Sequence, residues 1–441
     1  MPSLAPPQGM LAPVADSTRW TLADAAHTLR RLQFGYSPDQ LKQAVAAGRQ
    51  ATLDRLLSPQ PESAEFQEVD GVLRTTAVAT GNLSDLQVWW LYRMVHSANP
   101  LTEKLTLLWH NHFATSQEKV RSVSLMLRQN DLQRSEASGS FAKLLRGMAR
   151  DPAMLVWLDG EANRRRHPNE NFAREVMELF SLGVGNYSEK DIQEAARAFS
   201  GWQLRDGEFW FNDNQHDPRP KTIFGETGMF DGNSVVELCL KQPACARYLA
   251  FKLLRTFVMP EPGEAEITAV AERLRLHGLV IGPVMNELAR SQLFYDARHR
   301  RSLIKSPLDF VLGMTHSLLE AVRWQPVAQT LAELGQSLFA PPSVKGWDGQ
   351  RLWITSSTLI LRANAATDVA TSGRFGVLTD AVRGQLAQPD SAVAFLQSIV
   401  LGGEADAETV AQIRTMTQTG DSQAGQAALQ LALQSPEYQL M

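Results

Sequence analysis

Residues 169–202, NENFAREVMELFSLGVGNYSEKDIQEAARAFSGW, decide the local fold because they carry start and stop signals for two successive helices. Asn169 is suited to cap the first helix, and Gly183 follows its last apolar residue. Ser188 and Asp191 form the capping-box pattern that opens the second helix. The stretch therefore predicts two antiparallel helices joined by a tight turn.

On the first predicted helix, over residues 169–182, two acidic residues border the apolar stripe instead of lying opposite to it. These are Glu175 and Glu178, three residues apart and thus on one side of a helix. Carboxylates that are buried at such an edge need a cation or a proton. One interpretation is a polar site that contains both acids. The other is an ordinary surface helix in which Arg174 pairs with Glu170 or Glu178.

The composition describes a globular chain with a large core. Of the 441 residues 44% are hydrophobic, and 43 basic residues stand against 47 acidic ones, giving a net charge of −4. No long basic run or aromatic RNA-binding pattern occurs, so nucleic acid is not expected as a partner. Cys239 and Cys245 stand outside any CxxC pattern, so we expect two buried structural thiols.

The beginning of the chain predicts a flexible arm. Residues 1–18 are rich in Pro, Ala and Ser, and they precede one helical domain over residues 19–441. The arm has no basic n-region, no sustained apolar h-region and no twin arginine, and no later stretch reaches the ~18 apolar residues of a transmembrane helix. The sequence by itself therefore predicts a cytoplasmic protein without a transmembrane segment, and it leaves the oligomeric state open.

Helical spacing of apolar residues recurs along almost the whole chain, which predicts a mainly α fold with many helices in a single body. Besides the two helices above, the predicted helices cover residues 22–32, 38–47, 51–57, 84–96, 101–113, 235–240, 244–257, 264–276, 282–290, 307–322 and 325–339. The clearest β element is one short hairpin near Asp206-Gly207, a turn pair between two β-prone runs.

Two histidines at the end of an apolar helix, His110 and His112, are candidate metal ligands. Residues two apart on a helix point about 200° away from each other, so both can bind one ion only if the helix ends between them. In a continuing helix His112 shares the buried face with Leu105 and Leu108 and is the expected ligand, while His110 turns away. The alternative is a buried histidine with an ordinary hydrogen-bond partner, which is the commoner fate.

Two loops supply further candidates. The polar loop after the hairpin contains His216, Asp217 and Lys221, and long loops of this type in a compact domain are often functional. Because the second helix returns antiparallel, we expect this loop to face the first helix across a polar cleft. The other loop, from residue 340, concentrates Trp347 and Trp353 among turn formers, which predicts an aromatic wall that closes a core or shapes a pocket.

Four segments in fixed order carry a family resemblance: residues 27–41 (HTLRRLQFGYSPDQL), 101–113 (LTEKLTLLWHNHF), 169–202 followed by 216–225 (HDPRPKTIFG), and 341–364 (PPSVKGWDGQRLWITSSTLILRAN). Together they closely resemble the bacterial family called domain of unknown function 1800. The resemblance spans nearly the whole chain and implies a predominantly helical protein, without implying an activity. Genes of relatives commonly lie beside genes for the domain of unknown function 1501, whose members often carry twin-arginine export signals. The resemblance therefore implies such a partner, with either a cytoplasmic association or export carried by that partner.

Two classes of function follow. In the first, the protein is an enzyme, a metal-dependent hydrolase that activates a bound water with Zn, Mn or Fe. Its expected metal ligands are His110 or His112, Glu175 and His216, with His112 preferred, and its expected catalytic residues are Glu175, Glu178, Asp217 and Lys221. His277 and His299 are expected to take no part.

In the second class, the protein is a non-catalytic binding or assembly factor that acts with the domain-of-unknown-function-1501 partner. The same polar residues then form a buried network in which Glu175, Arg174, Arg197 and Asp217 satisfy one another.

Overall fold

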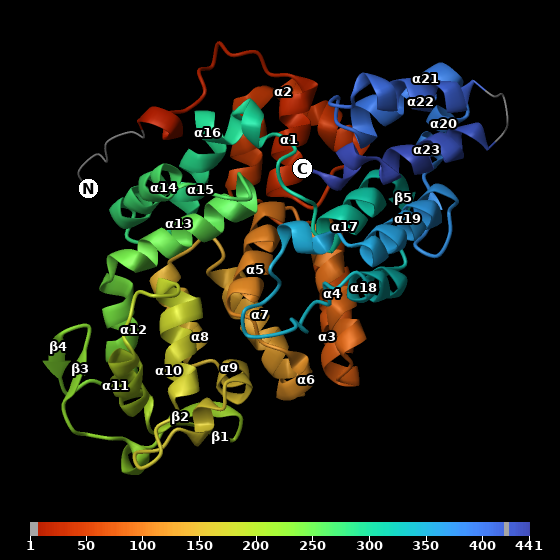
Figure 1. Cartoon of the computed structure of the whole chain (residues 1–441). Coiled ribbons are helices and arrows are strands. Elements are labelled where there is room, and N and C mark those ends of the chain that lie inside the picture. The colour runs from red at the N-terminus through yellow and green to blue at the C-terminus, as the bar shows by residue number, and fades with distance from the viewer. Residues whose placement is uncertain (1–7, 419–422) are drawn as a thin grey trace.

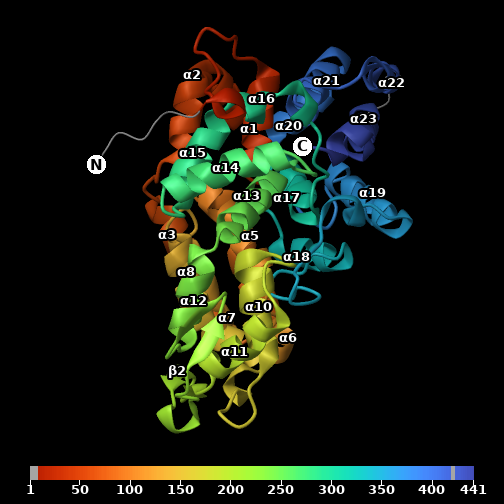
Figure 2. The ribbon, with the colours of Figure 1, turned by 60° about the vertical axis from the view of Figure 1, so that its left-hand side comes forward.

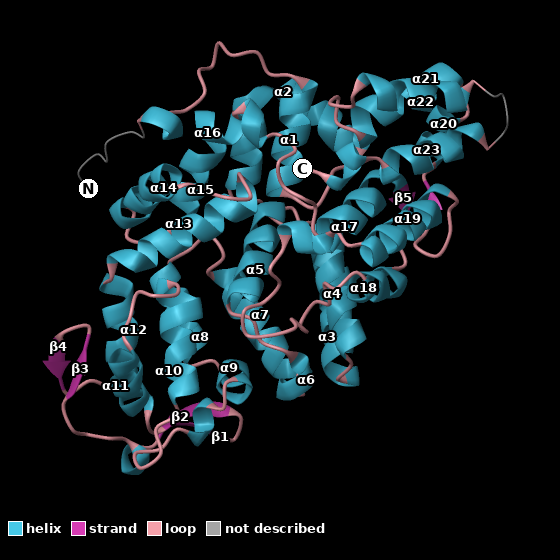
Figure 3. Cartoon of the chain, in the orientation of Figure 1, coloured by secondary structure: helices cyan, strands magenta, loops and turns pink. Residues whose placement is uncertain are grey.

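Twenty-three α-helices account for most of residues 8–418 and 423–441, the part of the chain that the computed structural model describes (Figures 1 and 3). The predicted mainly α fold is therefore confirmed. In the described chain no helix combines the length and the apolar composition needed to cross a bilayer.

The first third of the chain contains the helices α1 to α9. They are α1 (Leu22–Leu32), α2 (Pro38–Leu57), α3 (Ala64–Thr80), α4 (Leu83–His96), α5 (Pro100–His112), α6 (Gln117–Val120), α7 (Val123–Ser135), α8 (Phe141–Ala149) and α9 (Pro152–Trp157).

The middle third contains two hairpins and the helices on either side of them. They are α10 (Glu170–Met177), α11 (Glu189–Phe199), β1 (Trp202–Arg205), β2 (Glu208–Phe211), β3 (Lys221–Ile223), β4 (Glu226–Gly228), α12 (Gly232–Lys241), α13 (Pro243–Phe257), α14 (Glu264–Leu276), α15 (Ile281–Arg290) and α16 (Gln292–Tyr295).

The last third completes the body. Its elements are α17 (Pro307–Leu318), β5 (Leu319–Glu320), α18 (Trp324–Glu333), α19 (Ser356–Ala370), β6 (Val377–Leu378), α20 (Asp380–Leu386), α21 (Pro389–Phe395), α22 (Ala407–Thr417) and α23 (Ala424–Gln434).

One contiguous cluster of buried apolar side chains, from Leu11 to Tyr438, joins these thirds into a single body. Figures 1 and 2 show α8 and α10–α12 with the two hairpins at one end of the molecule and α20–α23 at the opposite end. Helices α5, α13 and α17 lie between these ends. The site described below therefore draws on helices from all three thirds of the chain.

The stretch at residues 169–202 folds as two packed helices with one unpredicted feature. Asn169 accepts a hydrogen bond from the Asn171 backbone N–H (3.0 Å), and Ser188 and Asp191 form the capping box of α11. Between them, α10 continues as a π-helical segment, Glu178–Leu182, which closes with a bond from Gly183 N to Glu178 O (2.9 Å). Such π segments hold one extra residue per turn and often occur at functional sites.

The hairpin predicted near Asp206-Gly207 is confirmed. Strands β1 and β2 pair antiparallel, and both turn residues have positive φ angles, 54° and 79°. Two residues with positive φ are typical of the type I′ turn that matches strand twist. Two further small sheets, β3–β4 and β5–β6, were not predicted, because strands of two or three residues are too short for an alternating pattern.

Several helix boundaries differ from the sequence prediction. The segments predicted at 38–47 and 51–57 form one element with a kink at Gly48, whose φ is 81°. The helix predicted over 307–322 ends earlier, because the chain leaves α17 at Leu318 and pairs β5 with β6. Helix α3 was not predicted, and only Phe66 and Ala77 of its residues are buried, so its apolar face is weak.

Residues 1–7 of the expected N-terminal arm lie outside the described residues. The following segment contains a 3-10 turn, Gly9–Leu11, whose Leu11 is buried. Val14 N then donates to Arg290 O, and Gln292 N donates to Ala12 O, both at 2.9 Å. This part of the arm thus lies against α15 and α16, and the boundary at residue 18 stays a prediction.

Candidate functional site

The two histidines of α5 are buried on different sides of the helix. The helix continues through His112, and both rings are at most 3% exposed, so His110 does not turn to solvent but enters a second part of the core. His110 Nε2 accepts a hydrogen bond from the Phe339 backbone N–H (3.1 Å). His112 Nε2 lies 3.0 Å from Phe180 O, and because a carbonyl can only accept, this nitrogen carries the proton.

The two acids of the first helix lie close enough to influence each other. Glu175 and Glu178 are both half-buried, and the Tyr187 hydroxyl donates a hydrogen bond to Glu178. Burial first, and then the negative charge of Glu178, raise the pKa of Glu175. Arg174 turns outward instead and pairs with Glu189 at 2.6 Å, with Glu170 at 3.9 Å as a second, weaker partner.

Asp217 is saturated by hydrogen bonds within the protein. Its Oδ2 accepts from Arg197 Nε (2.9 Å) and Arg219 Nη2 (2.6 Å), and its Oδ1 accepts from the backbone and side chain of Arg219. The buried Lys221 donates to the Asp217 carbonyl, and His216 Nδ1 donates to Ser200 O (2.9 Å). The predicted polar network therefore exists around Asp217 and Arg197.

The other two residues predicted for this network, Arg174 and Glu175, form no hydrogen bond or ion pair with Asp217 or Arg197 in the described chain. The second partner of Arg197 is instead Glu194 on the same helix, at 2.7 Å. The loop does return toward the beginning of α10, since Arg165 N donates to Gln215 O (2.7 Å) and Gly201 N to Asn163 O (3.2 Å). The polar cleft between loop and helix stays a prediction.

Within residues 8–418 and 423–441, no group of three or more His, Cys, Asp or Glu side chains is arranged to hold a metal ion. The four predicted ligands are not gathered: His110 and His112 bond to different segments, and His216 is tied to Ser200. A metal at these residues therefore stays a prediction that the observed positions do not support. Cys239 and Cys245 are free and buried, as expected for structural thiols.

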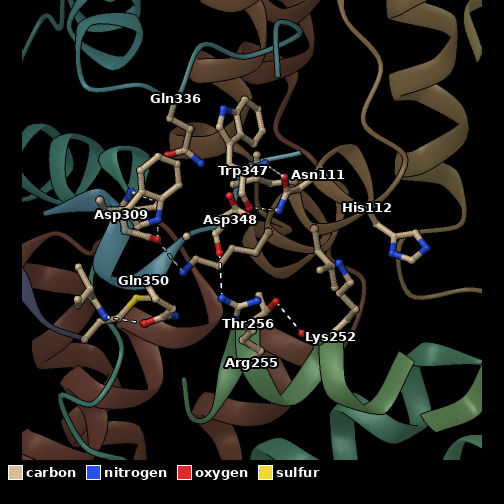
Figure 4. Close-up of a pocket in the computed structure, with 18 of the residues that line it drawn as sticks. Asn111, His112, Lys252, Arg255, Thr256, Asp309, Gln336, Trp347, Asp348 and Gln350 are labelled. Carbon is tan, nitrogen blue, oxygen red and sulfur yellow. Dashed lines mark hydrogen bonds and ion pairs between the residues drawn. The ribbon is translucent and has the colours of Figure 1, made fainter. Parts of the chain in front are cut away.

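A cavity of about 200 Å³ opens between α5, α13, the start of α17 and the loop of residues 334–353 (Figure 4). Of the residues predicted for the site, only His112 lines it. Leu107, Leu108 and the two predicted tryptophans, Trp347 and Trp353, form apolar parts of its wall. The predicted aromatic wall of this loop therefore shapes a pocket.

The polar lining of this cavity has an excess of positive charge. Its cationic residues are Lys104, Lys252, Arg255 and Lys345, and its acidic residues are Asp309 and Asp348. Lys104 is neutralised, because its Nζ lies 2.9 Å from Asp309 and donates to Arg30 O. Arg255 donates to the Asp348 backbone carbonyl (3.0 Å). The described chain offers Lys252 Nζ no hydrogen-bond or ion-pair partner, and its one aromatic contact is the Tyr248 ring, 5.1 Å from the ring centre.

The protonation states of two lining residues follow from this environment. Burial, followed by the charge of Arg255, lowers the pKa of Lys252 to about 8. Burial, followed by the charge of Lys252, lowers the pKa of His112 to about 3, so the ring is neutral at physiological pH. With Nε2–H bound to Phe180 O, the lone pair of His112 is on Nδ1. This buried atom has no hydrogen-bond partner in the described chain.

The wall opposite α13 is held by one asparagine. Asn111 Oδ1 accepts from Trp347 N (2.6 Å), and Asn111 Nδ2 donates to Trp347 O (3.2 Å), so a single side chain satisfies both backbone groups of that residue. The neighbouring Gly346 has a φ of 76° and passes directly over Asn111. A side chain at this position would strike the Asn111 oxygens.

Replacing Gly346 with Ala is therefore expected to destabilise the protein by more than the roughly 1–2 kcal/mol of a left-handed residue alone, and to displace the Trp347 loop. Gly349→Ala is the matched control, because its φ is 79° while its nearest atom, Trp353 Nε1, is 3.6 Å away. Urea denaturation and limited proteolysis of the loop measure both effects. Equal losses in the two variants would contradict the steric argument.

Sequence reasoning missed Lys252 and Arg255. A signal was present, because two cations three residues apart in a strongly apolar helix lie on one side of it. That spacing alone does not distinguish a pocket from a solvated face. Only the docking of α5 and the 334–353 loop encloses them.

Comparison with known proteins identifies the family. The model of the family described as "Protein of unknown function (DUF1800)" matches residues 27–440. No curated protein and no solved structure matches the chain. Since the family match covers nearly the entire sequence, from the middle of α1 to the penultimate residue, the chain belongs to the DUF1800 family.

Proposed function

We propose that this protein binds a small organic acid in the cavity between α5, α13 and the 334–353 loop. The observation that carries the proposal is the ammonium group of Lys252, which lines the cavity and makes no hydrogen bond or ion pair in the described chain, while the Asp348 carboxylate acts on it only through its charge. A partly desolvated cation without a directly bound counter-ion is costly, so an anion entering from solvent gains a strong interaction.

Arg255, beside Lys252, adds a second cation with a planar shape. Arg255 lies one turn further along α13, and its guanidinium uses only one N–H direction for the Asp348 carbonyl. The remaining N–H groups suit a carboxylate or phosphate, which guanidinium binds in a fork. In Figure 4 both side chains extend from α13 toward the loop that carries Trp347 and Asp348.

The size and the apolar lining indicate the rest of the ligand. Drug-sized ligands occupy sites of roughly 300–1,000 Å³, and this cavity of about 200 Å³ is smaller. Trp347, Trp353 and Leu108 offer flat or branched apolar surfaces beside the cations. We therefore expect an acid with a compact apolar or aromatic body.

Calorimetric titration with phenyllactate tests this proposal. Wild-type protein is expected to bind the acid, and Lys252→Met is expected to weaken binding by about tenfold or more, or roughly 1.4 kcal/mol, because the unpaired charge is removed. Lys252→Arg keeps the charge and is expected to retain most of the affinity. Lys143→Met, at an exposed lysine of α8, is the matched control and should bind as the wild type does.

Two results would overturn the proposal. One is equal affinity of Lys252→Met and wild-type protein for phenyllactate. The other is the absence of binding by wild-type protein to phenyllactate, benzoate and phenyl phosphate alike at millimolar concentration.

The proposal belongs to the binding class of function, and it leaves the other expectations as predictions. A partner from the domain-of-unknown-function-1501 family follows from resemblance alone, and co-purification tests it. Hydrolysis with Zn, Mn or Fe, held by His110 or His112, Glu175 and His216, has weaker support, because His216 and Asp217 are engaged elsewhere. Elemental analysis of the purified protein tests the metal.

A further inference from the structure

Building on the proposed anion site, we infer that Lys252 forms a reversible imine with the carbonyl group of a small 2-oxo acid whose carboxylate is held by Arg255. The inference names a ligand class for the site and adds a covalent step. It rests on the position of one unpaired amine, on the cation beside it, and on an unpartnered lone pair in the same wall.

Lys252 is the amine of this cavity that is both enclosed and free. Lys104 Nζ forms an ion pair with Asp309 and donates a hydrogen bond to the Arg30 carbonyl, so this nitrogen is not available to attack a ligand while those contacts persist. Lys345 lies on the exposed side of the loop, where its ammonium is hydrated. Lys252 instead projects from the middle of α13 against the Tyr248 ring.

The environment keeps a useful fraction of Lys252 as neutral amine. Burial, and then the neighbouring Arg255, lower its pKa to about 8, compared with 10.5 for an ordinary lysine. At pH 7.5 the neutral fraction is then on the order of a hundred times larger than for an exposed lysine. Lysines that are desolvated beside another cation are the typical amine nucleophiles toward carbonyl compounds.

The spacing on α13 matches the geometry of a 2-oxo acid. Lys252 and Arg255 are three residues apart, so their side chains leave the same side of the helix about 5–6 Å from each other at Cβ. In a 2-oxo acid the carboxylate is bonded directly to the carbonyl carbon. The inference therefore places the carboxylate on Arg255 and the adjacent carbonyl carbon at the amine of Lys252.

His112 completes the arrangement. Its Nδ1 lone pair is buried, has no partner within the described residues, and belongs to the same cavity wall as Lys252. Because Nε2–H is held by Phe180 O, Nδ1 can only accept a hydrogen bond. In the inferred reaction, this acceptor orients the amine or the hydroxyl group of the addition intermediate.

The covalent step balances without any oxidant or metal. The nitrogen lone pair of neutral Lys252 attacks the carbonyl carbon, a C–N bond forms, and the C=O π pair moves to oxygen. The nitrogen loses a proton and the oxygen gains one, which gives a carbinolamine. The hydroxyl group then takes up a proton and leaves as water while the nitrogen lone pair forms the C=N bond, and the iminium nitrogen releases its remaining proton, so amine plus 2-oxo acid equals imine plus water.

Reductive trapping tests the inference. Wild-type protein is incubated with phenylpyruvate and sodium cyanoborohydride near pH 7.5, and the modified lysines are located by peptide mass spectrometry. We expect Lys252 to be modified at least about tenfold faster than the exposed Lys143, since its amine is far less protonated. Excess phenyllactate, which has no carbonyl group, should protect Lys252 by occupying the same site.

The variants separate this inference from the anion proposal. Lys252→Arg is expected to bind phenyllactate yet yield no adduct in the cavity. Modification of Lys252 no faster than of Lys143 in the wild-type protein would overturn the imine while leaving anion binding intact. Absence of binding of phenyllactate, benzoate and phenyl phosphate to the wild-type protein would overturn both, and neither result depends on the folding of a variant.

Discussion

Replacing Glu103 with Ala is expected to lower the free energy of unfolding by about 3–5 kcal/mol, the loss typical of removing one partner from a buried ion cluster. The Glu103 side chain is 1% exposed. It accepts from Trp90 Nε1 (2.9 Å), Arg93 Nε (3.1 Å), and Arg134 Nε and Nη2 (2.9 and 3.0 Å). Alanine leaves Trp90 Nε1 and the facing N–H groups of the two arginines without their buried acceptor, although Arg93 keeps Asp70 (2.9 Å) and Arg134 keeps Asp131 (3.6 Å).

The acid dependence of this effect has a definite sign. Burial by itself would raise the pKa of Glu103, but the charges of Arg134 and Arg93 outweigh burial and lower it below the ordinary value. A carboxyl with a depressed pKa stabilises the fold above its unfolded pKa and loses that contribution as the pH falls through its folded pKa. The difference between wild type and variant should thus be constant from pH 7 to about pH 5 and shrink in stronger acid.

Urea denaturation of both proteins at several pH values measures the loss. Asp131→Ala is the control beside this cluster, because Asp131 is 38% exposed, pairs with the 40% exposed Arg74 and lies 3.6 Å from Arg134. Exposed pairs contribute about 0–1 kcal/mol, so this control should change stability little. Similar losses in the two variants would contradict the argument from burial.

Asp217→Ala is the second replacement with a large expected effect, a loss of about 2–3 kcal/mol. The value lies below that for a fully buried cluster because Arg219 is 65% exposed and Arg197 keeps Glu194. Hydrogen bonds from Arg219 and Arg197 hold the pKa of Asp217 well below its usual range. Its contribution is therefore fully present at neutral pH and declines only in acid.

The same variant distinguishes a structural from a catalytic Asp217. If the residue acts through the fold, Asp217→Ala loses stability while phenyllactate still binds to the folded protein with wild-type affinity, since Asp217 does not line the cavity. Unchanged stability together with altered ligand or metal binding would instead support the catalytic role that the sequence suggested. Chemical denaturation and calorimetry on one preparation give both quantities.

The elements that were predictable from sequence are those whose signals are local. Asn169, Ser188 and Asp191 specify the two helix starts through caps that involve only their nearest neighbours. Asp206-Gly207 similarly specifies its turn through its own φ angles. Such features depend on the residue and its immediate backbone, so one sequence is sufficient to find them.

The site was less predictable because side chains meet there across long sequence separations. Both histidines are buried, and only His112 lines the cavity; its partner, the Phe180 carbonyl, is set by the π segment after Met177. No sequence pattern predicts this π-helical segment. From the sequence, Lys252 is an ordinary lysine of an α-helix. Its importance comes from the lack of a hydrogen-bond or ion-pair partner in the described chain, and only the folded structure shows that lack.

The two hydrogen bonds between the Asn111 side chain and the Trp347 backbone link residues 236 positions apart in the chain. The cavity therefore exists only when the first and last thirds of the protein have docked, and the unfolded chain retains no part of it. A ligand that binds there must favour the native state by mass action, by about 2.7 kcal/mol at a free concentration one hundred times its dissociation constant. The thermal midpoint of the whole protein thus serves as a titration signal for an unidentified ligand, which allows metabolite mixtures to be screened without any assay of activity.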